Sequence, residues 1–290
     1  KVIFKTNDRI KAEGGKFNKD FFDWIQGVPR KQHEHPHGCI RKWFEPIKVN
    51  HINENGKYEV GIPKGQYSIS YDPVGVNKET SGITNKHSHN SIKVWENPTQ
   101  YNGFKGKLVC AYYGRPEKLE EADRICYYMA RYYNCIGTTG VEVNRGETVS
   151  NFTKWKALKY LMKDPVELWD SSIKAKVTAS YGVNMGGGSG QGTTKVLEGL
   201  RLTKEMLYSE VGKKLDGTPL YFFQTIYDYQ TILELLKWND KGNFDRVSEM
   251  LIHALQWKLN DVEAAKELAH RKKATVENYN DNIWERPWFT

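Results

Sequence analysis

Three acidic residues, Asp72, Glu142 and Asp245, stand where a carboxylate could do chemistry. Each falls at or beside the end of an expected helix or strand. Clustered carboxylates are costly to ionise together unless cations neutralise them. Mg²⁺ and Mn²⁺ prefer such oxygen ligands, and two ions about 4 Å apart can hold the attacking water and the leaving 3′-oxygen of a phosphodiester. If the three acids converge, the sequence predicts two-metal-ion phosphodiester hydrolysis.

Each acid also has a simpler interpretation when it is taken alone. An Asp before a proline, as in Asp72-Pro73, is typical of a turn. A carboxylate in a core strand, such as Glu142, is often paired with Lys or Arg. Asp245 could be an acid that interacts favourably with a helix dipole. Only the ordered set of three favours a shared site.

The strand that should carry the first acid covers residues 67–72. Tyr67, Ile69 and Tyr71 alternate there with polar residues, which is the period of a strand. Pro73 cannot donate a ladder hydrogen bond, so strand pairing should stop just after Asp72. Residues 90–96 and 107–113 predict two further strands, and the connections are short enough for an antiparallel meander.

The second acid should lie on a strand that is parallel to the first. An amphipathic helix is expected from Pro116 to about Tyr133, followed by a strand over residues 138–144. A helix between two strands implies a crossover and parallel pairing. Val141 and Val143 would share one face of this strand, so Glu142 would lie on the other.

The third acid should lie in the first turn of a helix, because Asn243 is a plausible N-cap. Val247, Met250, Leu251, Ala254 and Leu255 would give that helix its apolar face. Helices are also expected over residues 148–162, from Thr193-Thr194-Lys195 to about Val211, and over most of 223–238, with a turn at Asp216-Gly217. The predicted fold class is therefore α/β, a mixed sheet with a three-strand antiparallel meander plus parallel strands, flanked by helices.

The composition points to a polyanionic partner. The chain has 290 residues and a net charge of +8, which favours nucleic acid. No apolar run approaches a membrane span and no secretory signal is visible, so no membrane contact is expected. The four cysteines, Cys39, Cys110, Cys126 and Cys135, are interpreted as reduced thiols of a cytosolic protein. No Gly-x-x-x-x-Gly-Lys-Ser/Thr motif occurs, so these residues should not hydrolyse ATP.

Three segments are expected along the chain. Residues 1–65 predict a connecting or wrapping segment, and 66–260 the main domain, with a hairpin or loop lobe at 170–192. Residues 261–290 predict a helical and aromatic tail. His33, His35 and His37 suggest either a metal site or, as the favoured interpretation, a surface loop. The glycine-rich end of the lobe, 186–192, could contact substrate backbone or be a plain surface loop.

The stretch from about 66 to 256 resembles the nuclease domain of tailed-bacteriophage terminase large subunits, which has an RNase H-like fold. Tyr71-Asp72-Pro73-Val74-Gly75 is similar to the first acidic motif of that family. The second is resembled by Cys110 to Pro116, the helix after it, and Val141-Glu142-Val143-Asn144-Arg145-Gly146. The third is resembled by Ile226 to Trp238 followed by Gly242 to Val247. Tyr181-Gly182 and Thr193-Thr194-Lys195 look like the hairpin and helix that face DNA.

The resemblance implies that Asp72, Glu142 and Asp245 hold two Mg²⁺ or Mn²⁺ ions. The implied activity is endonucleolytic cleavage of concatemeric viral DNA during genome packaging, in the host cytoplasm. Double-stranded DNA, an upstream ATPase domain, the portal protein and the small terminase are the implied partners, and Lys195 and Arg145 are candidate contacts to the DNA backbone, with a solvated charge as the alternative for each. Many members carry a further acid after the first Asp; here Glu79, or otherwise Lys78, His87 or His89, occupies that loop.

Two other functions remain open at this point. The chain could be a DNA-binding or portal-docking module without activity, which the positive charge and aromatic tail would suit equally. It could also be another RNase H-like enzyme, such as a transposase or junction resolvase, which shares the acids but cuts selected DNA structures.

Overall fold

The computed structural model describes residues 3–4, 39–52, 55–74, 89–103, 106–143, 147–168, 181–185, 191–238 and 244–260. Several predictions from the sequence lie outside these residues. They are the ones on His33, His35 and His37, Lys78, Glu79 and His87, Arg145, residues 170–180 of the lobe, the glycines of 186–190, the N-cap Asn243, and the tail 261–290.

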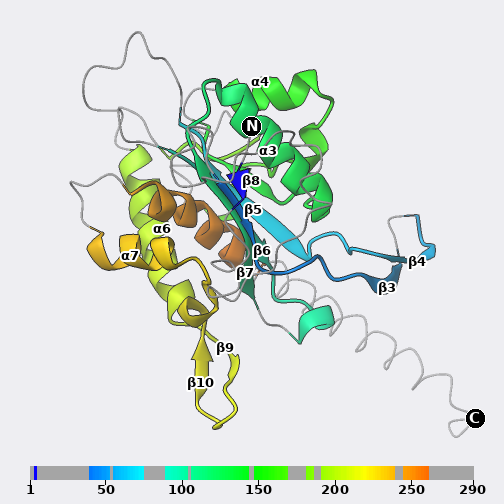
Figure 1. Ribbon diagram of the computed structural model, residues 1–290, viewed down its shortest axis with the longest axis vertical. Helices are drawn as coiled ribbons and strands as arrows, with labels where there is room; N and C mark the ends of the chain where they lie inside the picture. The colour runs from blue at the N-terminus through cyan, green and yellow to red at the C-terminus, as the bar shows by residue number, and fades with distance from the viewer. Residues whose placement is uncertain are drawn as a thin grey trace, which may run out of the picture.

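A six-stranded mixed sheet forms the centre of the molecule, in the order β1-β2-β7-β6-β5-β8 (Figure 1). Its strands are β1 (Ile3–Phe4), β2 (Cys39–Lys42), β5 (Tyr67–Asp72), β6 (Asn90–Glu96), β7 (Lys107–Gly114) and β8 (Thr139–Val141). The pairs β5–β6 and β6–β7 are antiparallel, which confirms the predicted meander, and β8 is parallel to β5, as the intervening helix predicted. Strand β5 ends at Asp72, immediately before Pro73. Strand β2, from the segment expected to connect or wrap, pairs antiparallel with β7.

The two faces of the sheet carry different residues because side chains alternate along each strand. Tyr67, Ile69 and Tyr71 of β5 belong to one buried cluster, together with residues of helices α3 and α4. Ser70 and Asp72 lie on the other face, which we call the site face. Its apolar cluster contains Trp43, Trp95 and, from the helix over 245–260, the buried residues Met250, Leu251, Ala254 and Leu255. The helices thus form a layer on each side of the sheet (Figure 1).

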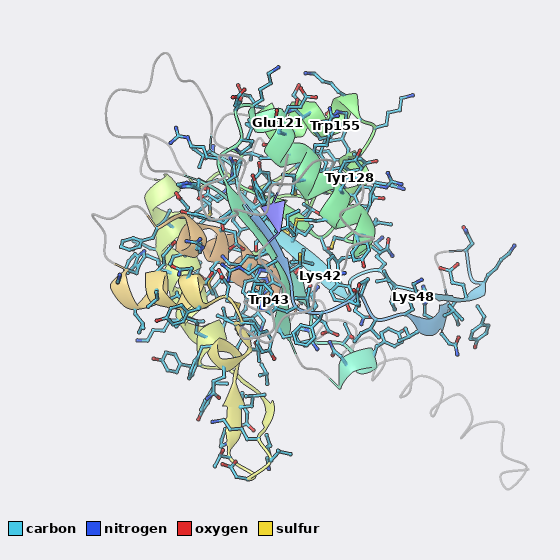
Figure 2. All side chains as sticks on the ribbon, in the orientation of Figure 1. Lys42, Trp43, Lys48, Glu121, Tyr128 and Trp155 are labelled. Atoms are coloured by element: carbon cyan, nitrogen blue, oxygen red, sulfur yellow. The ribbon has the colours of Figure 1, made fainter. Side chains whose placement is uncertain are left out.

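The layer opposite the site face consists of α3 (Leu119–Tyr132) and α4 (Glu147–Lys154). Helix α3 begins at Leu119 and not at Pro116, because Lys118 is still extended, with φ −120° and ψ 137°. Helix α4 ends at Lys154, so the prediction of a helix to residue 162 was wrong. Lys156 adopts a positive φ of 54°, which breaks the helix, and the chain continues as a 3₁₀ turn, η3 (Leu158–Tyr160). Figure 2 shows Glu121, Tyr128 and Trp155 in this layer.

The layer on the site face contains α6 (Gln191–Leu207), η5 (Phe222–Thr225), α7 (Tyr229–Lys237) and the helix over 245–260. The prediction that a helix continues to Val211 was wrong, because α6 ends at Leu207. A hairpin, β9 (Glu210–Lys213) and β10 (Pro219–Tyr221), follows instead. The predicted turn at its tip is confirmed, and Gly217 there has φ +81°.

The helix over 245–260 packs directly on strand β8. Its expected apolar residues Val247, Met250, Leu251, Ala254 and Leu255 are all buried. At Gly140 of β8, an added Cβ would lie 2.7 Å from Ile252 Cγ2 and 2.8 Å from Gln256 Nε2. Gln256 Nε2 also donates to the carbonyl oxygens of Ile69, at 2.9 Å, and Thr138, at 2.8 Å. The helix therefore contacts the backbone of the two parallel strands.

Smaller elements lie at the periphery. A second hairpin, β3 (Val49–Ile52) and β4 (Tyr58–Gly61), projects from the molecule, and Figure 2 shows Lys48 next to it. Two 3₁₀ turns, η2 (Gln100–Asn102) and η4 (Val166–Leu168), complete the described elements. Cys110, Cys126 and Cys135 are buried free thiols, as expected. No helix in the described part of the chain combines the length and the apolar character that a membrane crossing requires.

Candidate active site

Asp72 and Glu142 lie next to each other at the ends of the two parallel strands. Tyr71 of β5 is the register partner of Val141 of β8, and the amide of Glu142 donates to the carbonyl oxygen of Tyr71 at 3.0 Å. The next residue on each strand is the acid, so both acids lie on the site face. Their carboxyl groups share a hydrogen bond. The parallel pairing predicted from the sequence brings these two acids together.

The electrostatics of this pair are those of a crowded acidic site. Burial raises the pKa of Asp72 well above its usual value, and the neighbouring Glu142, Asp245 and Glu249 carboxyl groups raise it further. Two carboxyl groups can share a hydrogen bond only if one of them carries the proton. Burial and crowding therefore favour the protonated form of Asp72 in the metal-free protein.

Asp245 starts the helix over 245–260 and is tied to the neighbouring strands. Its Oδ2 accepts hydrogen bonds from the amide of His89 at 2.8 Å and from the hydroxyl of Tyr113 at 3.3 Å. Burial raises the pKa of Asp245, and the bonds from His89 and Tyr113 oppose this rise. Asp245 is thus held at the same end of the sheet as Asp72. It lies close enough for its carboxyl group to raise the pKa of Asp72.

Tyr113 is the central ring of a stack beside Asp245. The ring of His89 lies 4.7 Å away at an interplanar angle of 19°, and Arg246 Cζ lies 3.4 Å from the Tyr113 centroid. Arg246 is itself ion-paired with Glu234 and, at 3.6 Å, with Asp228. The stack therefore holds His89, the residue before β6, and Arg246, in the first turn of the helix, against the ring of Tyr113 on β7.

Two residues of the site were missed from the sequence, namely Lys93 of β6 and Glu249 of the helix. They form a buried ion pair next to Asp72. Glu249 follows Asp245 by four residues, which places both on one side of a helix. Lys93 stands between Ile92 and Val94 in a buried strand, where a lysine requires a partner. Both signals were present, but neither identified the partner.

Lys195, a candidate DNA contact, is buried in the structure. Its Nζ lies 3.2 Å from Asp164 Oδ2, and the Lys195 side chain is 8 % exposed. This is not the environment of a solvated charge, and a contact to DNA would have to compete with Asp164.

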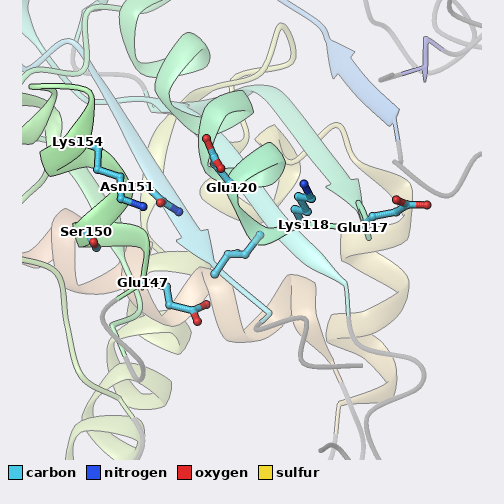
Figure 3. Close-up of a pocket in the computed structure, with 8 residues that line it drawn as sticks. Glu117, Lys118, Glu120, Glu147, Ser150, Asn151 and Lys154 are labelled. Carbon is cyan, nitrogen blue, oxygen red and sulfur yellow. The ribbon is translucent and has the colours of Figure 1, made fainter. Parts of the chain in front are cut away.

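A further buried acid, Asp123 of α3, lies on the opposite face. It accepts hydrogen bonds from Tyr71, Thr148 and Asn151, at 2.9, 3.0 and 2.7 Å, and burial raises its pKa to about 6. Above Asn151 an open pocket of about 350 Å³ lies between α4 and the start of α3 (Figure 3). It is lined by Glu117, Lys118, Leu119, Glu120, Glu147, Ser150, Asn151 and Lys154. The three predicted acids are not among these residues, so the pocket is separate from the carboxylate cluster.

The donor set on the site face has the chemistry that Mg²⁺ or Mn²⁺ requires, namely carboxylate oxygens that share a proton which a cation can replace. As the side chains lie, no three His, Cys, Asp or Glu residues within the described ranges are close enough to hold one ion together. Asp72 and Glu142 are adjacent, whereas Asp245 acts on Asp72 at longer range. A shared ion would thus draw Asp245 towards the other two.

No model of a known protein family matches the chain. No curated protein matches it at a significant level of sequence similarity either.

Proposed function

We propose that this chain is a divalent-metal-dependent DNA endonuclease with an RNase H-like domain, of the kind found in terminase large subunits. The observation that carries the proposal is the hydrogen-bonded pair of Asp72 and Glu142. Asp245 lies close enough to raise the pKa of Asp72 as well. Three acids from distant parts of the sequence lie at one end of one sheet, Asp72 and Glu142 adjacent to each other and Asp245 at longer range. The alternative interpretations as separate structural acids do not account for this convergence.

The topology supports the same proposal. A three-strand antiparallel meander, β5 to β7, is followed by helix α3 and by strand β8, which pairs parallel with β5. This strand order is compatible with an RNase H-like fold. In such a sheet the acids of the two parallel strands and of a later helix come together at one edge.

Each acid has a distinct part in the proposed site. Asp72 and Glu142 would give up their shared proton and offer oxygens from two adjacent strands, and Asp245 would offer a third from the helix. Mg²⁺ or Mn²⁺ ions bound there would neutralise the acids and activate water for attack on a phosphodiester. Tyr113 would orient Asp245 through its hydroxyl, which donates to Oδ2.

The substrate in this proposal is double-stranded DNA, in particular concatemeric viral DNA that is cut during packaging. The net charge of +8 supports a polyanion, and such binding should weaken steeply as salt rises. An upstream ATPase domain, the portal protein, the small terminase and a location in the host cytoplasm belong to the same proposal. They rest on the resemblance of the acidic motifs.

A plasmid-cleavage assay tests the proposal. Supercoiled DNA is incubated with the protein and Mg²⁺, Mn²⁺ or EDTA, and the nicked and linear products are measured. We expect cleavage with either metal and none with EDTA. Asp72→Asn, Glu142→Gln and Asp245→Asn should each lower the rate by at least about 10²-fold, because each removes a carboxylate that would hold the metal ions, and the ions stabilise the charge of the transition state.

Asp123→Asn is the matched control, because Asp123 is also buried but lies on the opposite face of the sheet. Folded Asp123→Asn protein should cleave plasmid DNA at the wild-type rate. Equal activity of wild type and Asp72→Asn would refute the proposal. Metal-independent DNA binding without cleavage would favour the inactive binding module, and cutting confined to branched DNA would favour a resolvase-type enzyme.

A further inference from the structure

A buried ion pair fastens the helix over 245–260 to strand β6. Lys93 Nζ donates to the carboxylate of Glu249 and, at 2.9 Å, to the main-chain oxygen of Arg246. Lys93 is 1 % exposed and Glu249 is fully buried. One ammonium group therefore binds the first turn of the helix through its backbone and the next turn through a side chain.

Glu249 is also bound by strand β5 and by a second residue of β6. Its Oε1 accepts a hydrogen bond from the Ser70 hydroxyl and lies 3.5 Å from Trp95 Nε1. Trp95 Nε1 donates to Ser70 Oγ at 2.7 Å, and the Trp95 ring stacks on His253 at 4.2 Å. The helix thus meets the sheet through a directional polar network, with aromatic packing one turn later.

This network lies immediately behind the carboxylate cluster. Ser70 precedes Asp72 by two residues on the site face of β5. Lys93 follows Ser91 by two residues, and Ser91 is the register partner of Asp72. Glu249 lies one helical turn after Asp245. The polar contacts therefore connect the strand that carries Asp72 with the helix that carries Asp245.

A buried ion pair is a weak source of stability, because the cost of removing two charges from water offsets their attraction. Replacing such a pair with well-packed apolar side chains of similar size often leaves the stability of the fold unchanged or raises it. What apolar contacts lack is direction, so they permit small shifts of a helix along a sheet. Hydrogen bonds from Ser70 and Lys93 to one carboxylate permit only one position.

We propose that Lys93 and Glu249 are positioning residues, which fix the helix over 245–260 along β5 and β6 and so set the place of Asp245 relative to Asp72. The inference rests on the proposed function in one respect, namely that the placement of Asp245 serves metal binding. The placement itself can be measured without metal.

The first experiment uses metal-free protein and the variant Lys93→Met/Glu249→Met, which removes one positive and one negative charge and keeps two long unbranched side chains. Asp72→Asn and Asp245→Asn are introduced singly and together into wild type and into this variant, and unfolding by urea is followed. In wild type the effects of the two Asn substitutions should be non-additive, because Asp72 and Asp245 repel each other. In the Met/Met variant at least half of this coupling should be lost. No coupling in wild type, or undiminished coupling in folded Met/Met protein, overturns the inference.

The second experiment measures Mn²⁺ binding by calorimetry. Met/Met protein should bind Mn²⁺ about 10–100-fold more weakly than wild type, as expected for the loss of residues that orient ligands. Lys42→Met is the matched control, since Lys42 is another buried lysine, on the opposite face and bonded to Tyr132. It should bind Mn²⁺ like wild type. Equal affinity of folded Met/Met protein and wild type would count against the positioning role.

Two further outcomes are decided by the same design. If wild type binds no Mn²⁺, the proposed function fails, while the metal-free coupling still decides the positioning role. If the Met/Met protein does not fold, Glu249→Asp takes its place. Its side chain is one methylene shorter and cannot reach Ser70 and Lys93 unless the helix moves. Unchanged coupling in that variant would again overturn the inference.

Discussion

The carboxyl groups of Asp72 and Glu142 share a hydrogen bond across the ends of two adjacent parallel strands. This contact joins residues that lie 70 positions apart in the sequence, and together with burial it raises the pKa of Asp72 well above its usual value. It therefore links the ionisation of the site to the stability of the fold and to cation binding.

The stability of the metal-free protein should fall as the pH rises above the ordinary range of an aspartate. The pKa of Asp72 is raised in the folded state, so the folded protein binds more protons than the unfolded chain between the two pKa values. The contribution of Asp72 is then fully present below the unfolded pKa and is lost as pH rises through the folded pKa. Asp72→Asn should remove this loss and be more stable than wild type at neutral pH in EDTA.

Urea unfolding at a series of pH values checks this expectation. Asp216→Asn is the control, because Asp216 lies at the tip of the β9–β10 hairpin and its pKa is lowered by Thr218. A pH slope for Asp72→Asn equal to that of wild type would contradict the expectation.

Binding of Mn²⁺ should release roughly one proton, because a cation replaces the proton shared by Asp72 and Glu142. Affinity for Mn²⁺ should accordingly rise with pH. Calorimetry in two buffers of different ionisation enthalpy measures the proton count. Glu142→Gln should bind Mn²⁺ more weakly and release less. Heat that is independent of the buffer would show that the proton does not lie in the metal site.

Tyr113→Phe should weaken the site without dismantling it. The change removes the hydroxyl that donates to Asp245 at 3.3 Å and keeps the ring that stacks between His89 and Arg246. Loss of one such hydrogen bond costs about 0.5–1.5 kcal/mol, so cleavage should fall by about 2–12-fold. Plasmid-cleavage rates measure it, with Tyr112→Phe as the control on the opposite face. A rate loss as large as that of Asp245→Asn would mean that Tyr113 does more than orient the acid.

Gly140→Ala should destabilise the fold and lower activity together. The new methyl group would meet Ile252 and Gln256 at less than 3.0 Å, and overpacking of this kind costs about 1–3 kcal/mol. Urea unfolding and plasmid cleavage measure the two effects. Gly199→Ala is the comparison, because its nearest neighbours, Leu251 Cβ and Met185 Cε, lie at 3.2 Å and alanine favours a helix. Equal stability of Gly140→Ala and wild type would show that the helix can move away freely.

The strands and the pairing of the first two acids were predictable because their signals are local. Alternation along residues 67–72, the stop at Pro73 and the helix before Glu142 together determine the register that brings Asp72 and Glu142 together. The end of α4 was not predictable, since it depends on the left-handed conformation of Lys156, a residue with no preference for it. The β9–β10 hairpin was missed because Val211 is the one buried residue among the four of β9. A single buried residue gives no alternating pattern that would predict a strand.

The network around Lys93 was beyond reach for a different reason. A lysine in a buried strand indicates that it has a partner, but this partner lies 156 positions away on a helix. Nothing in the local pattern of β6 selects Glu249 over another acid. Long-range polar pairs of this kind become visible only when the packing of the helix on the sheet is known.

Gly140 leaves only a hydrogen atom between strand β8 and the helix that carries Asp245. The spacing between the strand that leads to Glu142 and the helix that begins at Asp245 is consequently set where the side chains of Ile252 and Gln256 meet the backbone of β8. Side chains of graded size at position 140 would act as spacers of known thickness. They would make the separation of the acids an adjustable quantity, against which the reaction rate could be plotted.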